Sequence, residues 1–261
     1  MVSLYTSSET FAEFETQIAE TWDLEEGYRL VDLEYVDDAW TGVFVDSDGA
    51  NRYEEEKDFA ALEEKISANW DEDYDLIDIE YIDEQWVAVF DKGFGGSAYN
   101  VSDDLTEFAE DTEKLWNEEG LDLANIEYAD GQWISIYGDD LGSSAYSTSD
   151  NLTGFQEAIQ ERLDNGFDLV GVEYAEETWV GVFHQDNYRS SAYAINGDRQ
   201  KFDAELERRT EAGYDLVDLE TIDDKWIGVY EKPNSAISEA EESSANIAVL
   251  GAHTDFIGSY I

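Results

Sequence analysis

One acidic position returns five times along this chain at almost constant intervals. Glutamate occupies it in every copy, with steps of 46 or 47 residues: Glu34, Glu80, Glu127, Glu173 and Glu220. The residues two places earlier are Asp32, Asp78, Asn125, Gly171 and Asp218. Carboxylate oxygens are the ligands that hard cations such as Ca²⁺ prefer. If the elements that carry these residues converge, the five glutamates and three aspartates would form a metal site.

The same acids have a plainer interpretation, because acidic side chains usually lie in water. They could occupy the solvent face of each strand in a protein that is acidic everywhere. In the convergent arrangement, the like charges would need a bound cation or raised pKa values. The sequence leaves both arrangements open.

These acids belong to a longer repeated sequence motif, the repeat phrase, of which YDLIDIEYIDEQWVAVF at 74–90 is one copy. Its tryptophan recurs at steps of 46, 47, 46 and 47 residues: Trp40, Trp86, Trp133, Trp179 and Trp226. A period of this length indicates a solenoid, propeller or ring built from one supersecondary unit per repeat.

The hydrophobic period within a repeat identifies its elements. A stripe with a step of four, such as Leu62, Ile66 and Trp70, predicts an amphipathic helix before the phrase. Alternation then predicts a hairpin, with Ile77, Ile79 and Tyr81 on one face and Asp78 and Glu80 on the other. A small residue two places after each tryptophan predicts close packing against the strand: Gly42, Ala88, Ser135, Gly181 and Gly228.

A further short strand precedes each helix, as SLYTSS at the start of the chain and SAYNVS at 97–102. The sequence therefore predicts an α+β fold of tandem β-α-β-β repeats of about 47 residues. We expect a propeller-like ring, because closure removes edge strands; an open arc is the alternative. The predicted units are 1–48, 49–94, 95–141, 142–188 and 189–232, with a degenerate sixth unit at 233–261 as a cap.

Charge is the strongest compositional signal. The 261 residues include 14 basic and 65 acidic side chains, for a net charge of −51. Such a field repels nucleic acids and anionic membranes and attracts cations and basic proteins. The acid excess resembles that of proteins from salt-loving organisms. Hydrophobic residues make up 42% of the chain, which argues against a disordered acidic tail.

The chain offers little for catalysis. It has no cysteine, no G-x-S-x-G elbow and no phosphate-binding loop, and we expect both histidines, His184 and His253, to lie in surface loops. The opening MVSLYTSSETF has neither a basic region nor a long apolar run, and no apolar run reaches membrane-spanning length. We therefore expect a cytoplasmic, non-enzymatic protein without membrane insertion.

The pattern W-x-x-G-Y-x-L-x-D-I-E-Y, followed by W-V-x-V-F and S-x-Y, resembles the tandem Trp-Gly-Tyr repeat modules of bacterial proteins and of plant casein-kinase-like kinase C-termini. This resemblance implies an accessory or interaction module. In units four and five the tryptophan of W-x-x-G-Y is replaced by Leu163 and Thr210. The predicted architecture is also similar to pentein rings, whose enzymes require a cysteine that this chain lacks.

Three functions follow from these features. The first is a binding or assembly scaffold for a high-salt or cation-rich setting, with a protein partner of basic character. The second is an acidic ring that binds a divalent cation, Ca²⁺ or another, with no further cofactor. The third is a decoy that mimics nucleic-acid charge and occupies a basic protein.

Overall fold

The computed structural model describes residues 3–24, 27–46, 49–93, 95–139, 141–185, 189–222 and 225–233. Within these ranges the chain forms five units, each with one helix and one three-stranded antiparallel sheet. The order along each unit is strand, helix and hairpin, which confirms the predicted β-α-β-β repeat. The predicted sixth unit lies outside the described residues, apart from Pro233 at the end of the last strand.

The same four elements recur in units 1 to 5. The first strands are β1 (Ser3–Ser8), β4 (Asn51–Glu56), β7 (Ser97–Ser102), β10 (Ser143–Ser149) and β13 (Arg189–Asn196). The helices are α1 (Phe11–Trp22), α2 (Phe59–Trp70), α3 (Leu105–Lys114, continued by the π-turn η1, Leu115–Glu119), α4 (Leu152–Asp164) and α5 (Arg199–Glu211). The inner strands are β2 (Tyr28–Val36), β5 (Asp75–Ile82), β8 (Asp122–Ala129), β11 (Asp168–Ala175) and β14 (Asp215–Ile222). The middle strands are β3 (Ala39–Asp46), β6 (Gln85–Asp91), β9 (Gln132–Gly138), β12 (Thr178–Gln185) and β15 (Lys225–Pro233).

Each helix begins at a side chain that caps it. The capping oxygen accepts a hydrogen bond from a backbone N–H of the first turn, a group that has no partner within the helix. The capping residues are Thr10, Asp58, Asp104, Asn151 and Asp198. Each helix then turns its apolar stripe toward the sheet, as Leu62 and Ile66 of α2 do.

Each helix covers one face of its own sheet, over the middle strand. The predicted close approach is confirmed at Gly42 of β3, where an added Cβ would lie 2.7 Å from Phe14 Cζ. Gly228 faces Phe202 of α5 in the same way, at 2.9 Å. In unit 2, Leu62 takes the place of the helix phenylalanine and Ala88 the place of the strand glycine. The smaller helix side chain leaves room for the methyl group of the alanine.

A β-bulge interrupts the inner strand of every unit, and it corrects the predicted alternation. In β5 the register shifts between Leu76 and Asp78, so Leu76, and not Ile77, shares the helix-facing side with Ile79. The bulged Ile77 packs instead against the apolar cluster of unit 1. A bulge adds one residue on one strand, which a strict two-residue period does not anticipate.

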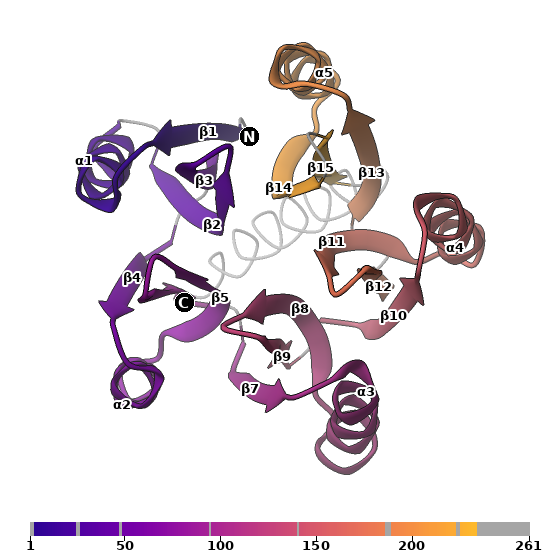
Figure 1. Cartoon of the computed structure of the whole chain (residues 1–261), viewed down its shortest axis with the longest axis horizontal. Helices are drawn as coiled ribbons and strands as arrows, with labels where there is room; N and C mark the ends of the chain where they lie inside the picture. The colour runs from indigo at the N-terminus through magenta and orange to yellow at the C-terminus, as the bar shows by residue number, and fades with distance from the viewer. Residues whose placement is uncertain are drawn as a thin grey trace, which may run out of the picture.

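The second face of each sheet packs on the preceding unit. Val87 and Val89 of β6 are buried in the cluster that contains Phe14 and Ile18 of unit 1. The same holds at the other junctions, and Val43 of unit 1 is buried beside Phe202 of unit 5. Figure 1 shows the inner strands gathered around the middle of the molecule and the helices at its outside. Consecutive inner strands contact one another, and β14 contacts β2.

A polar clasp repeats at all five junctions. A side-chain oxygen at the start of the first strand accepts the backbone N–H of a leucine in the inner strand of the preceding unit. Ser3 accepts from Leu216 at 2.6 Å, and Ser191 accepts from Leu169 at 2.7 Å. The remaining acceptor–donor pairs are Asn51 with Leu30, Ser97 with Leu76 and Ser144 with Leu123. The inner strand is the edge of its sheet, so it carries N–H groups that its one partner strand does not bind, and the clasp satisfies one of them.

The glycine contact predicts a paired effect. Gly42→Ala should lower the free energy of unfolding by about 1–3 kcal/mol, because the added Cβ would overlap Phe14 and Leu30. Adding Phe14→Leu, which reproduces the Leu62 and Ala88 pair of unit 2, should recover part of this loss. Gly197→Ala is the control, since its Cβ would approach nothing closer than 3.7 Å. Equal urea midpoints for the Gly42 and Gly197 variants would contradict the packing described.

Candidate cation site

The eight acids singled out by the sequence lie together in the interior, between neighbouring inner strands. We call them the central carboxylate cluster: Asp32, Glu34, Asp78, Glu80, Glu127, Glu173, Asp218 and Glu220. Seven are buried, from 0% exposure at Asp78 to 8% at Glu34 and Glu220, and Glu80 is half-buried. The interpretation that placed them on a solvent face is therefore wrong. In unit 2, Asp78 and Glu80 pair with Val89 and Val87 across the sheet. The face that these four residues share packs on unit 1.

Three glutamates from adjacent units approach most closely. One carboxylate oxygen from each of Glu34, Glu80 and Glu127 lies within 4.8 Å of the other two. They stand on β2, β5 and β8, at the same register position of three consecutive inner strands. Three negative charges at this separation repel one another strongly unless a proton or cation lies among them.

The aspartates of the cluster differ in how well they are hydrogen-bonded. Asp32 Oδ2 accepts the backbone N–H of Leu219 at 3.1 Å, and Asp218 Oδ2 accepts that of Val172 at 3.2 Å. Each of these bonds joins neighbouring units. Asp78 is fully buried, and the backbone N–H groups of Ile79 and Leu33 lower its pKa against the effect of burial. Its Oδ2 nevertheless has no hydrogen-bond partner of normal geometry among the described residues. An acceptor left in this state is costly in the interior, and it is available to a ligand.

Asn125 breaks the fivefold repetition of acids. Its Nδ2 donates to Glu127 Oε1 at 2.9 Å and lies 3.3 Å from Asp78 Oδ1, so one amide holds two carboxylates of the cluster. Its Oδ1 accepts the N–H of Ile126 at 2.9 Å. Unit 4 has Gly171 at this position and contributes no side chain there. Asn125 therefore fixes the acids on the side of the cluster formed by units 2 and 3.

No base in the described part of the chain balances the cluster. Of the ion pairs between described residues, none includes any of its eight carboxylates. Burial raises the pKa of Asp78 and of Glu173 to about 7. Burial, followed by the charges of Asp78 and Glu173, raises the pKa of Glu127 well above its usual range. Near neutral pH the cluster must hold protons or attract cations.

The spacing of the three glutamate oxygens suits a hard cation. Ca²⁺ takes oxygen ligands at about 2.3–2.6 Å, so two ligands on opposite sides of one ion are about 4.6–5.2 Å apart. For Mg²⁺ the corresponding separation is about 4.2 Å. The three oxygens, all within 4.8 Å of one another, can reach a single ion of either kind. A set of buried protein carboxylates favours Ca²⁺, because Mg²⁺ usually keeps several of its waters. Asp78, whose Oδ2 has no hydrogen-bond partner among the described residues, is linked to Glu127 through the Asn125 amide.

Sequence reasoning missed three features of this region. The clasp serines stand in the repeated S-A-Y motif, which could have suggested a shared role, but their backbone partners lie in the preceding unit, which the motif does not identify. The role of Asn125 as a bridge needed knowledge of its neighbours in unit 2. His184, expected in a surface loop, lies half-buried in β12 with Nε2 2.8 Å from the Leu123 carbonyl oxygen of unit 3. His253 lies outside the described residues.

A comparison with protein-family models finds no match for the chain, and a comparison with curated proteins finds none either. Among the helices of the described ranges, none is long and apolar enough to cross a membrane.

The raised pKa values predict an unusual pH dependence. When the pKa of a carboxyl rises on folding, the folded protein keeps the proton at pH values between the two pKa values, where the unfolded chain has already lost it. Without divalent cations, the free energy of unfolding should therefore fall as pH rises from about 4.5 to 7. Glu173, with a pKa raised from 4.5 to about 7, would account for about 3 kcal/mol of this fall.

Denaturant unfolding across this pH range, in the presence of a chelator, provides the measurement. Glu173→Gln should flatten the slope, because glutamine need not ionise. Glu64→Gln removes the same charge at an exposed position of α2 and should leave the slope unchanged. If the Glu173 and Glu64 variants kept the same slope, the buried titration would be refuted.

Proposed function

We propose that this protein is a non-enzymatic repeat scaffold that binds Ca²⁺ at its centre. This proposal depends mainly on one observation: carboxylate oxygens of Glu34, Glu80 and Glu127 lie within 4.8 Å of one another in the interior. They have no basic partner among the described residues. The unpartnered Oδ2 of Asp78 is the independent sign that a ligand is expected there. Glu34, Glu80 and Glu127 would bind the ion directly, and Asp78 would complete its surroundings.

Charge favours this role over a cluster held by protons alone. With a net charge of −51, the molecule concentrates cations around itself and brings them to the site. One Ca²⁺ would neutralise two of the buried negative charges and supply an electrostatic partner for the third glutamate. In a low-dielectric interior this attraction is much stronger than at the surface.

We also infer that the five units close into a propeller-like ring around the cluster. The contacts between units 5 and 1 support closure, because they have the form of those at the other junctions. Ser3 accepts the N–H of Leu216, and Tyr5 donates its hydroxyl proton to Asp203. At the junction of units 1 and 2, Tyr53 donates to Glu15 in the corresponding way. An open arc would leave this set of partners unused at its two ends.

The second candidate function is a scaffold or decoy for a basic protein. The excess of 51 acidic over basic side chains favours it, because the central cluster accounts for only eight of the acids. Such a surface would attract a basic partner by long-range steering that weakens with salt. This role is compatible with a bound cation at the centre.

Calcium binding can be tested by calorimetric titration and by thermal unfolding. Millimolar CaCl₂ should raise Tm well above the value in NaCl of equal ionic strength, because a bound ligand stabilises the folded state. Glu34→Gln with Glu80→Gln should weaken Ca²⁺ binding at least about tenfold, through loss of charged ligands. Glu9→Gln with Glu64→Gln removes the same charge from exposed positions and should leave the affinity unchanged. Equal stabilisation by the two salts would overturn the proposal.

Closure has its own test. Ser3→Ala and Ser191→Ala remove equivalent clasp acceptors, so in a closed ring each should cost about 1–2 kcal/mol of unfolding free energy. Ser67→Ala, on the exposed side of α2, is the control and should change stability by less than about 0.5 kcal/mol. An open arc would instead make Ser3→Ala as mild as the control.

A further inference from the structure

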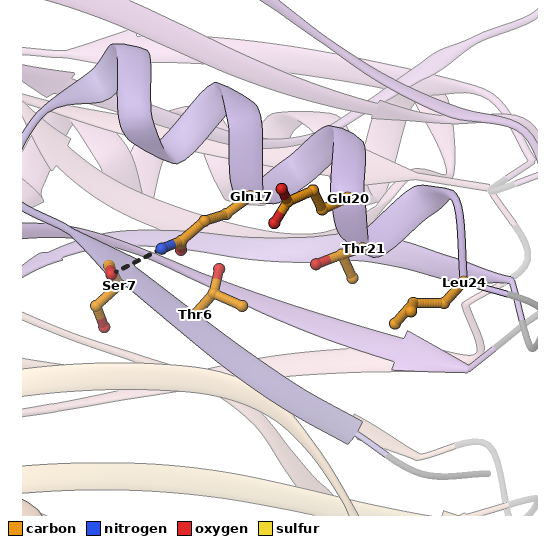
Figure 2. Close-up of a pocket in the computed structure, with 6 residues that line it drawn as sticks. All are labelled: Thr6, Ser7, Gln17, Glu20, Thr21 and Leu24. Carbon is orange, nitrogen blue, oxygen red and sulfur yellow. Dashed lines mark hydrogen bonds between the residues drawn. The ribbon is translucent and has the colours of Figure 1, made fainter.

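A polar groove runs between β1 and α1 in unit 1, and its lining differs in chemical character from the central carboxylate cluster. It has a volume of about 370 Å³. Figure 2 shows the strand residues below the helix residues, with the Thr6 hydroxyl pointing toward the helix. The lining residues are Thr6, Ser7, Gln17, Glu20, Thr21 and Leu24.

The other units show what normally fills this place. In unit 4, Arg162 of α4 lies over the strand edge: its Nη2 donates to the Tyr146 carbonyl oxygen at 2.9 Å and its Nε to Ser147 Oγ at 3.0 Å. In unit 5, Arg209 Nη2 lies 3.4 Å from the Tyr193 carbonyl oxygen. Both arginines follow the buried helix phenylalanine by seven residues. A guanidinium thus satisfies the free edge of the first strand in two of the five units.

Unit 1 lacks this arginine. Seven residues after Phe14 stands Thr21, which is too short to reach the strand edge as Arg162 does. On the strand, Thr6 occupies the position of Ser147, since each follows its clasp serine by three residues. Thr6 Oγ1 is buried and has no hydrogen-bond partner among the described residues. In unit 1 the Thr6 hydroxyl is present, and the arginine that would donate to it is missing.

This state is peculiar to unit 1 among the described polar residues at this strand position. Helix side chains of the same unit pair with the equivalents of Thr6 in units 2, 3 and 4. These pairs are Glu54 with Lys65, Asn100 with Asp111 and Ser147 with Arg162. Unit 5 has Ala194, which needs no partner. A buried hydroxyl without a partner costs free energy that a suitable ligand would recover.

Two further side-chain oxygen acceptors belong to the groove. Gln17 donates its Nε2 proton to the Ser7 carbonyl oxygen at 3.3 Å, and its Oε1 is buried without a partner among the described residues. Glu20 adds a carboxylate on the same helix side (Figure 2). Leu24, which is 45% exposed, offers apolar surface at the end of the groove. Acceptors around a space with an apolar end match a side chain that has several donors and an aliphatic stem.

We propose that the unit 1 groove binds an arginine side chain supplied by a basic protein partner, in the place that Arg162 and Arg209 fill in units 4 and 5. Thr6 Oγ1 and Gln17 Oε1 are covered in the structure. On binding, these two side chains turn to accept hydrogen bonds from the guanidinium, which faces the Glu20 carboxylate while its stem lies along Leu24. Arginine suits the groove better than lysine, because its planar group presents five donors in a fixed fork. This inference is independent of cation binding at the centre.

The experiment uses the full chain and a short capped peptide, glycine-arginine-glycine, with lysine and citrulline peptides for comparison. Amide chemical shifts should change at Thr6, Ser7 and Thr21, and the arginine peptide should bind at least about tenfold more tightly than citrulline. Thr21→Arg, which reproduces unit 4, should fill the groove from within and weaken peptide binding by at least about tenfold.

Two further variants keep the proposal testable if Thr21→Arg folds poorly. Thr6→Val removes the unpartnered hydroxyl with little change of shape, and Glu20→Gln removes the charge; each should weaken arginine binding. Glu161→Gln is the matched control, since Glu161 holds the place of Glu20 in unit 4. Undiminished binding by these groove variants, equal binding of the citrulline peptide, or shifts spread over all five units would overturn the proposal.

Discussion

Each sheet of this protein has two apolar faces and only one helix to cover them. In unit 2, α2 covers the side of Ala88 and Phe90, while Val87 and Val89 face away from it. A unit by itself would leave those valines in water, at a cost of about 1.5–3 kcal/mol for each large aliphatic side chain. Packing on the preceding unit removes this cost. The assembly of units, the meeting of the inner strands and the position of the acids all depend on this need for a second cover.

That same packing carries the acids inside. Glu80 shares a strand face with the residues that must be buried, so the apolar contact cannot form without bringing the carboxylates together. Apolar burial is spread over dozens of side chains, whereas the repulsion is confined to eight groups. The fold can therefore tolerate the cluster, provided that protons, cations or backbone donors reduce its charge. Leu219 and Val172 show the last of these remedies through their N–H bonds to Asp32 and Asp218.

The repeat and its elements could be read from the sequence because they depend on local periodicity. The tryptophan spacing, the helix stripe and the small residue after each tryptophan report contacts made within one unit. The burial of Glu34, Glu80 and Glu127 could not be predicted in this way. A strand shows the same two-residue alternation whether its polar face lies in water or against a neighbouring unit. The bulge at Ile77 was missed for a related reason. It places one side chain against the preceding unit, and no pattern within the repeat records that partner.

The clasp between Ser3 and Leu216 has a consequence for the connectivity of the chain. The non-covalent contacts that join unit 5 to unit 1 are of the same kind as those that join units connected by peptide bonds. Few residues connect successive units, as between Asp91, which ends β6, and Ser97, which begins β7. The contact between units 5 and 1, which no peptide link joins directly, is therefore specified by packing and hydrogen bonds alone. In the ring proposed above, a chain cut at any of the four links between units and rejoined between units 5 and 1 would keep the same set of partners.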